Sequence, residues 1–194
     1  MIRFVDICIS IVGIIFLAPI FILIAVLIVL GSKGGVFYLQ KRVGLYGQIF
    51  TLYKFRTMTT GADKSGLLTI GNDSRITAIG KILRKYKLDE FPQLINVING
   101  NMSIVGPRPE VEEYVNLYTE QQREILKVKP GITDLASIHF SNENEILGKV
   151  DNPRVYYIEV IMPAKIDFNM EYIKNPTLKN YFKIIFKTIL KIFR

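Results

Sequence analysis

A long uncharged segment near the amino terminus constrains the fold of this chain more than any other feature. No charged residue occurs from Ile7 to Ser32, and only Ser10, Gly13 and Pro19 interrupt its apolar part. As a straight helix the apolar part would be about 36 Å long, whereas the hydrocarbon core of a bilayer is about 30 Å thick. The segment is therefore long enough to cross a membrane.

Pro19 divides this segment near its middle. Proline removes a backbone hydrogen bond and bends a helix, which leaves two arms of about 18 Å that are each too short to cross. Positive charge flanks both ends, with Arg3 before the segment and Lys33, Lys41 and Arg42 after it. A single span fits this pattern, as does a helix that kinks at Pro19 and returns to the same face. A cleaved signal peptide fits poorly because the apolar run is too long.

Composition limits the remaining possibilities. A length of 194 residues favours one compact domain besides the membrane segment. The net charge of +8 predicts anionic partners, and 49% hydrophobic residues favour lipid headgroups and phosphates over nucleic acid. The single cysteine, Cys8, cannot form an intramolecular disulfide, and the single histidine, His139, has no matching nucleophile motif, so we expect it to be structural or at the surface.

The rest of the chain predicts an α+β fold that is mainly helical. Residues 36–39 and 48–53 read as the strands of a small β-hairpin, and residues 57–73 as a loop rich in glycine. Apolar periodicity predicts a helix over residues 75–86, a second from Asp89 to Ile98, and a polar helix from Glu110 to Lys127. We expect a membrane-inserted helix over residues 1–32 and one head domain over residues 33–194.

The carboxyl-terminal segment predicts a basic amphipathic helix. Lysine recurs at every fourth position from Lys179 to Lys191, and isoleucine, leucine and phenylalanine cover much of the remaining surface. Such a helix is suited to the interface of an anionic membrane. A helix docked on the protein core with its lysines in water fits the same pattern.

Two neighbouring carboxylates, Asp89 and Glu90, and the proline-flanked Arg108 are the strongest chemical signals. At a helix start the carboxylates would be stabilised by free N–H groups, which would also favour a phosphate. Two carboxylates repel a phosphate unless cations intervene, so we expect Mg²⁺ held by Asp89 and a phosphate clamp formed by Arg84 and Arg108. An ordinary helix cap is the simpler explanation for an isolated Asp-Glu pair.

Several segments together identify the chain as similar to a known family. They are Lys54-Phe-Arg-Thr-Met58, Asp73-Ser-Arg-Ile-Thr77, Leu88-Asp-Glu-Phe-Pro-Gln93, Asn96-Val97, Met102-Ser-Ile-Val-Gly-Pro-Arg-Pro109 and Lys129-Pro-Gly-Ile-Thr133. Their order and spacing resemble those of the bacterial sugar transferases, specifically the small monotopic phosphoglycosyl transferases that act on undecaprenyl phosphate. The resemblance covers nearly the whole chain.

This resemblance implies a membrane enzyme on the cytoplasmic face of the bacterial inner membrane. Asp89 matches the nucleophile, which takes a phosphosugar from a UDP-sugar, releases UMP and passes the phosphosugar to polyprenol phosphate. Glu90 matches the second member of the dyad, for positioning or general-base work. Lys54, Arg56, Arg84 and Arg108 lie in matching segments, which implies phosphate binding or charge pairing that shapes the site. The resemblance also favours the re-entrant helix over a full span.

The chain departs from the family pattern in three places. Ala18 stands where relatives have a serine before the proline, so a hydroxyl that could bond the freed backbone is missing. Asp134 and Leu135 follow Thr133 where many relatives have Gly-Trp, and Ser141 and Asn142 stand where an arginine is expected. These departures predict an altered sugar or nucleotide pocket, to which Arg154 could supply a replacement positive charge.

Two other classes of function remain open on the sequence. A non-enzymatic membrane adaptor would explain the basic helices, and a phosphatase or pyrophosphatase would use Asp89 with water as the acceptor. The sequence does not choose the sugar, the glycan pathway or the oligomeric state.

Overall fold

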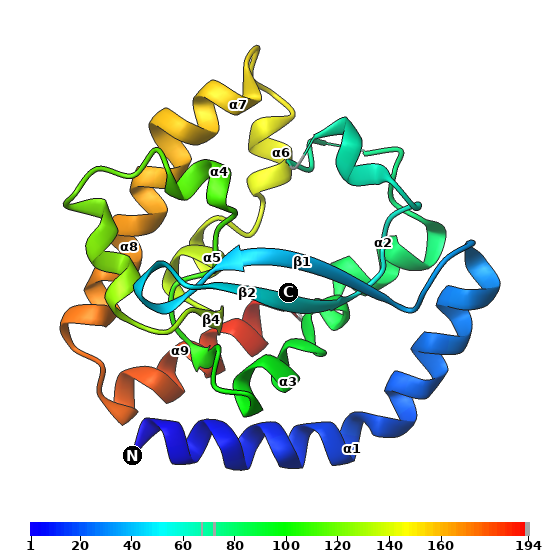
Figure 1. Ribbon diagram of the computed structural model, residues 1–194, viewed down its shortest axis with the longest axis horizontal. Coiled ribbons are helices and arrows are strands. Elements are labelled where there is room, and N and C mark those ends of the chain that lie inside the picture. Colours follow the sequence, from blue (N-terminus) through cyan, green and yellow to red (C-terminus); the bar gives the residue numbers. More distant parts are fainter. Residues whose placement is uncertain (67, 72, 193–194) are drawn as a thin grey trace.

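The computed structural model describes residues 1–66, 68–71 and 73–192. The fold is mainly helical, with two small two-stranded sheets (Figure 1). The α-helices are α1 (Ile2–Gly31), α2 (Ala78–Lys85), α3 (Gln93–Ile98), α4 (Glu112–Val115), α5 (Leu135–His139), α6 (Glu143–Leu147), α7 (Pro153–Tyr156), α8 (Met162–Lys174) and α9 (Leu178–Ile192). The strands are β1 (Phe37–Val43), β2 (Ile49–Phe55), β3 (Ser103–Val105) and β4 (Gly131–Thr133). The shorter helical turns are η1 (Leu45–Gly47), η2 (Ala62–Ser65), η3 (Leu88–Glu90), η4 (Gln122–Lys127) and η5 (Tyr157–Ile161).

Helix α1 runs along one edge of the molecule and then turns upward (Figure 1). Pro19 lies inside the helix and accounts for the bend, because it cannot donate a backbone hydrogen bond and its ring pushes away the preceding turn. Among the described residues, α1 alone is long and apolar enough to cross a membrane. Its first arm packs on α3, and its second arm packs near α2.

The predicted β-hairpin is present, with strands longer than expected. β1 and β2 pair antiparallel from Phe37 with Phe55 to Val43 with Ile49. The connection places Tyr46 and Gly47 at positive φ, 53° and 78°, as tight turns between twisted strands require. One face of the hairpin carries Leu52 into the core and, on the same face, presents polar side chains from both strands.

β3 and β4 pair in parallel and bring two distant loops together. A Cβ atom on Gly131 would collide with the backbone of Gly106, and one on Gly106 would collide with the backbone around Pro130. Glycine is required at both positions because the two chains touch here. The segment that follows β3 is thereby fixed against the segment that precedes β4.

The interior consists of three groups of buried apolar side chains. The largest lies among β1, α4, η4, η5 and α8, and includes Tyr114, Tyr157 and Met162. The second joins β2, α3, β3 and α9, and the third joins α1, β2 and α2. Because Ile24 and Ile28 of α1 belong to the third group, this long apolar helix completes part of the core.

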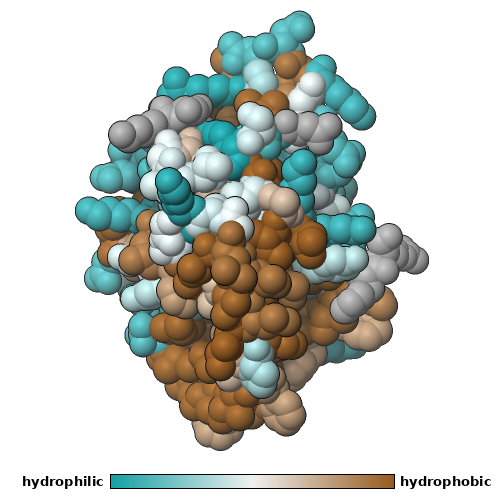
Figure 2. Space-filling view, turned by 90° about the vertical axis from the view of Figure 1, so that its right-hand side faces the viewer, coloured by the Kyte–Doolittle hydropathy of each residue, from teal (hydrophilic) through white to brown (hydrophobic). Residues whose placement is uncertain are grey.

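Exposed apolar side chains concentrate where α1 lies. Figure 2 shows hydrophobic residues gathered over the lower part of the molecule and hydrophilic residues over the upper part. Helix α9 is docked on the core and also leaves apolar side chains exposed. Tyr181 and Ile184 are buried against the core, whereas Phe182, Phe186 and Ile189 are exposed.

Three predicted helices differ from the observed ones. The first spans residues 78–85 rather than 75–86, because the Thr77 side chain accepts a hydrogen bond from Gly80 N and caps the helix there. The helix predicted from Asp89 begins as the turn η3 and becomes α-helical only at Gln93. The polar helix predicted over residues 110–127 is wrong as a continuous element.

That polar segment is divided into α4 and η4 by a local cap. The Thr119 hydroxyl accepts from Gln122 N at 3.2 Å, and the Gln122 side chain accepts from Thr119 N at 2.9 Å. This reciprocal pair is a capping box, which starts a new helical turn after Thr119 that leads into η4. The predicted loop over residues 57–73 holds for most of its described length, apart from the turn η2 and a short bridge between Met58 and Ile76.

Candidate active site

A cavity of about 1570 Å³ lies beneath the β-hairpin, and it brings together all six residues predicted for the site. Its polar part is lined by β1, β2, η3 and the loop after β2. Its apolar part is lined by side chains of α1 and α9, among them Leu17, Ile185 and Ile189. The cavity therefore joins a charged region to the two helices with the most exposed apolar surface.

Asp89 and Glu90 lie side by side in the turn η3, and both are buried. Lys87, the residue before η3, has a φ of 55°, a left-handed conformation that reverses the chain after α2 and starts the new turn. The backbone then continues through Pro92 into α3. The carboxylates thus precede the α-helix by one turn, and they are held at the cavity wall by a backbone reversal.

Glu90 is fixed by two cations. Arg108 donates to both of its oxygens, at 2.9 Å to Oε2 and 2.5 Å to Oε1, and Lys54 Nζ lies 3.9 Å from Oε1. Burial opposes ionisation of Glu90, but Arg108 and Lys54 outweigh it and lower the pKa of this carboxyl. Burial, reinforced by Arg108, lowers the pKa of Lys54 to about 7 even though Glu90 acts in the opposite direction. Glu90 is therefore a fixed anion and a poor proton acceptor.

Asp89 has the opposite environment. Burial, followed by repulsion from Glu90, raises the pKa of Asp89, and Lys54 and Arg84 only partly compensate. Its Oδ1 atom is buried and has no hydrogen-bond partner among the residues that the structure describes. A buried carboxylate oxygen without a donor is costly for folding alone, which favours a role in binding or chemistry.

Arg84 and Arg56 both line the cavity but are held differently. Arg84 donates to the hydroxyls of Thr57, at 2.9 Å, and Thr69, at 3.2 Å, so hydroxyls rather than carboxylates orient it. Arg56 donates to the backbone and side-chain oxygens of Ser32, at 3.0 and 3.1 Å. Arg84 is placed to meet an anion near Asp89, whereas Arg56 fastens the end of α1 to the hairpin.

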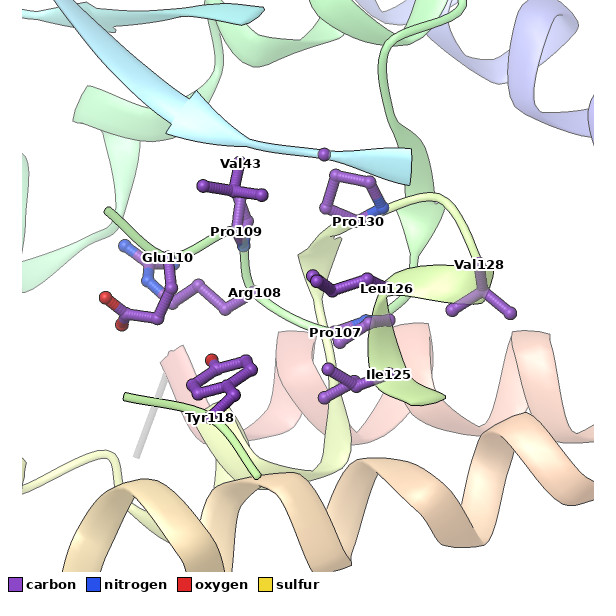
Figure 3. Close-up of a pocket in the computed structure, with 11 residues that line it drawn as sticks. Val43, Pro107, Arg108, Pro109, Glu110, Tyr118, Ile125, Leu126, Val128 and Pro130 are labelled. Atoms are coloured by element: carbon purple, nitrogen blue, oxygen red, sulfur yellow. The ribbon is translucent and has the colours of Figure 1, made fainter. Parts of the chain in front are cut away.

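The backbone around Arg108 is supported by a small apolar pocket on its other side. Figure 3 shows Pro107 and Pro130 packed near Ile125 and Leu126, while the Arg108 side chain extends away from Pro130. Both flanking prolines restrict their own φ angles, and the Gly106 to Gly131 contact fixes the segment below. Arg108 is therefore aimed at Glu90 by a rigid support.

Arg42 belongs to the same wall, although it was not among the predicted site residues. It donates to Gln40 Oε1 and to the Pro109 carbonyl, and its Nη1 lies 3.7 Å from Glu110 Oε2. Tyr157 donates to the other Glu110 oxygen at 2.6 Å. The sequence could have indicated Arg42, because the alternation of side chains along β1 puts Gln40 and Arg42 on one face of the strand.

Arg75 organises the loop at the cavity rim and was also missed as a functional residue. Its guanidinium contacts both oxygens of Asp73, at 2.6 Å for the closest pair, and donates to the carbonyls of Ala62, Gly66 and Leu68. The Arg75 side chain thus holds several parts of the loop together. The short Asp-x-Arg spacing was the only local sign of this contact.

The segment after Thr133 and the more distant candidates have structural roles. Asp134 caps α5 by accepting from Ser137 N and Oγ, both at 2.7 Å, while Ser137 and Ser141 line the cavity. Arg154 forms an exposed pair with Glu113 at 2.7 Å, so the suggestion that it replaces a site cation is not supported. His139 is exposed and lies against the Phe168 ring at 4.4 Å between centroids, as expected for a structural residue.

The chemistry around Asp89 fits a magnesium ion with few protein ligands. Among the described residues, no group of three or more His, Cys, Asp or Glu side chains could hold a metal. Mg²⁺ commonly binds one or two carboxylates and completes its shell with substrate phosphates and water. The unpartnered Asp89 Oδ1 fits such a site.

Comparisons with known proteins agree with this arrangement. Residues 1–194 match the bacterial sugar transferase family. The exopolysaccharide production protein ExoY of Sinorhizobium fredii is 34% identical over 96% of this chain and 83% of its own length. The UDP-glucose:undecaprenyl-phosphate glucose-1-phosphate transferase of Klebsiella pneumoniae is 36% identical over 97% of this chain and 39% of its own length.

A third relative carries a different sugar in its name. The UDP-N-acetylgalactosamine-undecaprenyl-phosphate N-acetylgalactosaminephosphotransferase of Aeromonas hydrophila is 35% identical over 96% of this chain and 42% of its own length. This chain thus spans about two fifths of the length of the two relatives named for a sugar. A family match along the whole chain, together with a relative matched over most of its own length, shows that this protein is a transferase belonging to the bacterial sugar transferase family.

Proposed function

We propose that this protein transfers a phosphosugar from a UDP-sugar to polyprenol phosphate through a covalent intermediate on Asp89. The observation that carries the proposal is the contrast within the Asp-Glu pair. Glu90 is locked by Arg108, whereas the adjacent Asp89 presents an unpartnered oxygen in the same cavity. A carboxylate that is buried, close to cations and free of hydrogen-bond donors is suited to nucleophilic attack.

The proposed reaction has two displacements at one phosphorus. An Asp89 oxygen attacks the sugar-bearing phosphorus of the UDP-sugar, a new P–O bond forms, and the bond to the bridging oxygen breaks to release UMP. A phosphate oxygen of polyprenol phosphate then attacks the same phosphorus. The bond to Asp89 breaks, which regenerates the carboxylate and gives a polyprenyl-diphosphate-linked sugar.

Positive charge around the pair supports both steps. Arg84 and Lys54 face the region near Asp89, and both favour its ionised form, which the first step requires. Bound Mg²⁺, held by Asp89 and substrate oxygens, would supply further charge neutralisation at the phosphates. Glu90 acts through its contacts with Arg108 and Lys54, since its lowered pKa favours positioning over proton transfer.

The apolar part of the cavity is suited to the lipid acceptor. Ile9, Gly13 and Leu17 line it at every fourth position of α1, and Ile185, Ile189 and Ile192 line it from α9. A polyprenyl chain placed between these helices would bring its phosphate toward the charged region. Water as acceptor does not require such a surface, which favours a transferase over a phosphatase.

The attachment of α1 supports a re-entrant helix on the cytoplasmic face of the inner membrane. Arg3 near its start contacts α3, and Ser32 at its end contacts Arg56, so both ends are tied to one compact domain. A straight helix of this length would separate its ends by about 45 Å, on opposite sides of a membrane. The bend at Pro19 and the exposed apolar surface of α9 favour insertion into one leaflet, beside anionic lipids.

The names of the relatives suggest a role in exopolysaccharide synthesis but differ in the sugar. The test is UMP release by the purified full-length protein in nanodiscs with Mg²⁺, polyprenol phosphate, and UDP-glucose, UDP-N-acetylgalactosamine or another UDP-sugar. We expect equal amounts of UMP and lipid-linked sugar, and radioactivity from a sugar-labelled donor on the protein when the acceptor is omitted. Asp89→Asn should abolish both.

Two outcomes would contradict the proposal. UMP formation without any lipid-linked product would indicate a hydrolase. Turnover by the Asp89→Asn variant would remove the covalent mechanism.

A further inference from the structure

Asp6 is a buried carboxylate in the membrane helix, 2% exposed and outside the cavity. It accepts hydrogen bonds from the Ile104 backbone N–H at 2.9 Å, from Ser103 Oγ at 2.8 Å and from Tyr181 Oη at 2.8 Å. These donors come from β3 and α9. A charge at this depth is retained only with full pairing, so its contacts hold β3 to the first turns of α1.

Arg3 makes a second attachment one turn earlier. Its guanidinium donates to the carbonyl oxygens of Val97, at 2.5 Å, and Ile98, at 3.0 Å. These carbonyls belong to the last turn of α3, where unpaired acceptors and the negative end of the helix dipole attract a cation. Arg3 therefore fixes the carboxyl-terminal end of α3 to α1.

The two attached elements lead directly to the two halves of one ion pair. β3 ends at Val105, three residues before Arg108, and α3 begins at Gln93, three residues after Glu90. Arg108 and Glu90 then meet through two hydrogen bonds. The contacts form a closed circuit from α1 through α3 to Glu90, across to Arg108, and back through β3 to α1.

We propose that Arg3 and Asp6 are positioning residues that set Glu90 and Arg108 relative to each other, so that the first turns of the membrane helix control the geometry of the active site. Neither side chain touches the cavity wall formed by Asp89 and Glu90, and both act through backbone elements. The proposal rests on the proposed function only where turnover is the readout.

The first test is a double-mutant cycle on thermal unfolding, which requires no substrate. Asp6→Ala and Glu90→Gln are measured singly and together in nanodiscs. Because both changes interrupt the same circuit, the Tm decrease of the double variant should be clearly smaller than the sum of the two single decreases. Asp6→Asn, which keeps an acceptor for the Ile104 N–H, is the milder variant if Asp6→Ala does not fold.

A matched control separates coupling from general destabilisation. Asn152 caps α7 by accepting from Val155 N at 3.2 Å, and α7 has no part in the circuit. Asn152→Ala should lower Tm, and its decrease should add to that of Glu90→Gln. Additive decreases for Asp6→Ala with Glu90→Gln would overturn the proposal.

The second test uses turnover to identify positioning. In the otherwise native protein, Asp6→Ala and Arg3→Gln should each lower kcat at least tenfold with KM for the UDP-sugar changed less than threefold. In an Arg108→Gln background the same changes should lower the residual kcat less than twofold, because the circuit is already open. Equal losses in both backgrounds, or losses that parallel detachment from the membrane, would overturn the proposal.

Together the two tests distinguish a wrong proposed function from a wrong positioning circuit. Absence of any turnover in the native protein with coupled unfolding would contradict the proposed function and leave the positioning circuit standing. Turnover in the native protein with additive unfolding and equal kinetic losses would contradict the circuit alone.

Discussion

Replacing each of the two adjacent carboxylates by its amide should change stability in opposite directions. Glu90→Gln removes the charge that Arg108 and Lys54 surround, and the amide NH₂ group must face one of the guanidinium donors. Asp89→Asn removes a charge that burial and Glu90 both disfavour, as the raised pKa of Asp89 indicates. Replacement by the amide therefore removes a charge that its surroundings stabilise at Glu90 and a charge that its surroundings destabilise at Asp89.

The magnitude for Glu90→Gln follows from the burial of the pair. Removing one partner of a buried ion pair costs about 3–5 kcal/mol, because the other charge is left uncompensated. Since 28% of the Arg108 side chain is exposed and water can partly solvate it, we expect about 3 kcal/mol. For a domain of this size each kcal/mol shifts Tm by about 2–4 °C, so Glu90→Gln should lower Tm by roughly 6–12 °C. Asp89→Asn should raise it.

Thermal unfolding in nanodiscs at pH 7 measures both shifts. Mg²⁺ and nucleotide are omitted, since ligands that bind the native state stabilise it by mass action. Glu113→Gln is the matched control, because it breaks an exposed pair with Arg154 and should change Tm by no more than about 4 °C. Similar decreases for Asp89→Asn and Glu90→Gln would refute the reasoning, because they would show that both carboxylates stabilise the fold.

Three further predictions concern the elements around the site. Hydrogen bonds with Arg75 hold the pKa of Asp73 below its usual value, so the stabilisation that they supply is fully present above about pH 4 and is lost as pH falls through the lowered pKa; the protection factor of the Thr59 amide hydrogen, which bonds the Arg75 carbonyl, should fall over that range. Gly131→Ala should reduce the free energy of unfolding by more than about 3 kcal/mol in denaturant titration, because its Cβ would collide with backbone and leave β3 and β4 unable to pair. Asn96→Ala removes both hydrogen bonds that this buried side chain makes to β2, and calorimetry should show a Tm lower by roughly 4–12 °C, which corresponds to about 2–3 kcal/mol.

Local patterns in the sequence were sufficient for the elements whose causes are local. The β-hairpin follows from two apolar runs separated by glycines, and the bend in α1 follows from a proline in an apolar helix. The start of α2 could also have been placed correctly, because Thr77 is a preferred helix cap. The break at Thr119 could have been found from its Thr-x-x-Gln pattern, since a capping box is a local signal.

The roles of individual cations depended on contacts that no local pattern records. Arg56 was expected to bind phosphate or to shape the site by charge pairing, and its guanidinium contacts Ser32, 24 positions away. Arg3 was interpreted only as a flanking charge and no contact was predicted for Asp6, yet the partners of both lie more than 90 positions along the chain. The sequence could predict that these cations lie in one region, but only the tertiary contacts decide which group each of them binds.

The participation of α1 in the core has a consequence for how the protein is made. Ile24 and Ile28 are buried against Phe55 and Leu83, so the domain that follows α1 lacks part of its interior without it. During synthesis α1 emerges before the hairpin and can enter the membrane before the hairpin exists, so the later segments would assemble against an anchor already in place. A version that starts at residue 33 would expose this apolar surface to water and would be expected to aggregate rather than to form a smaller active enzyme.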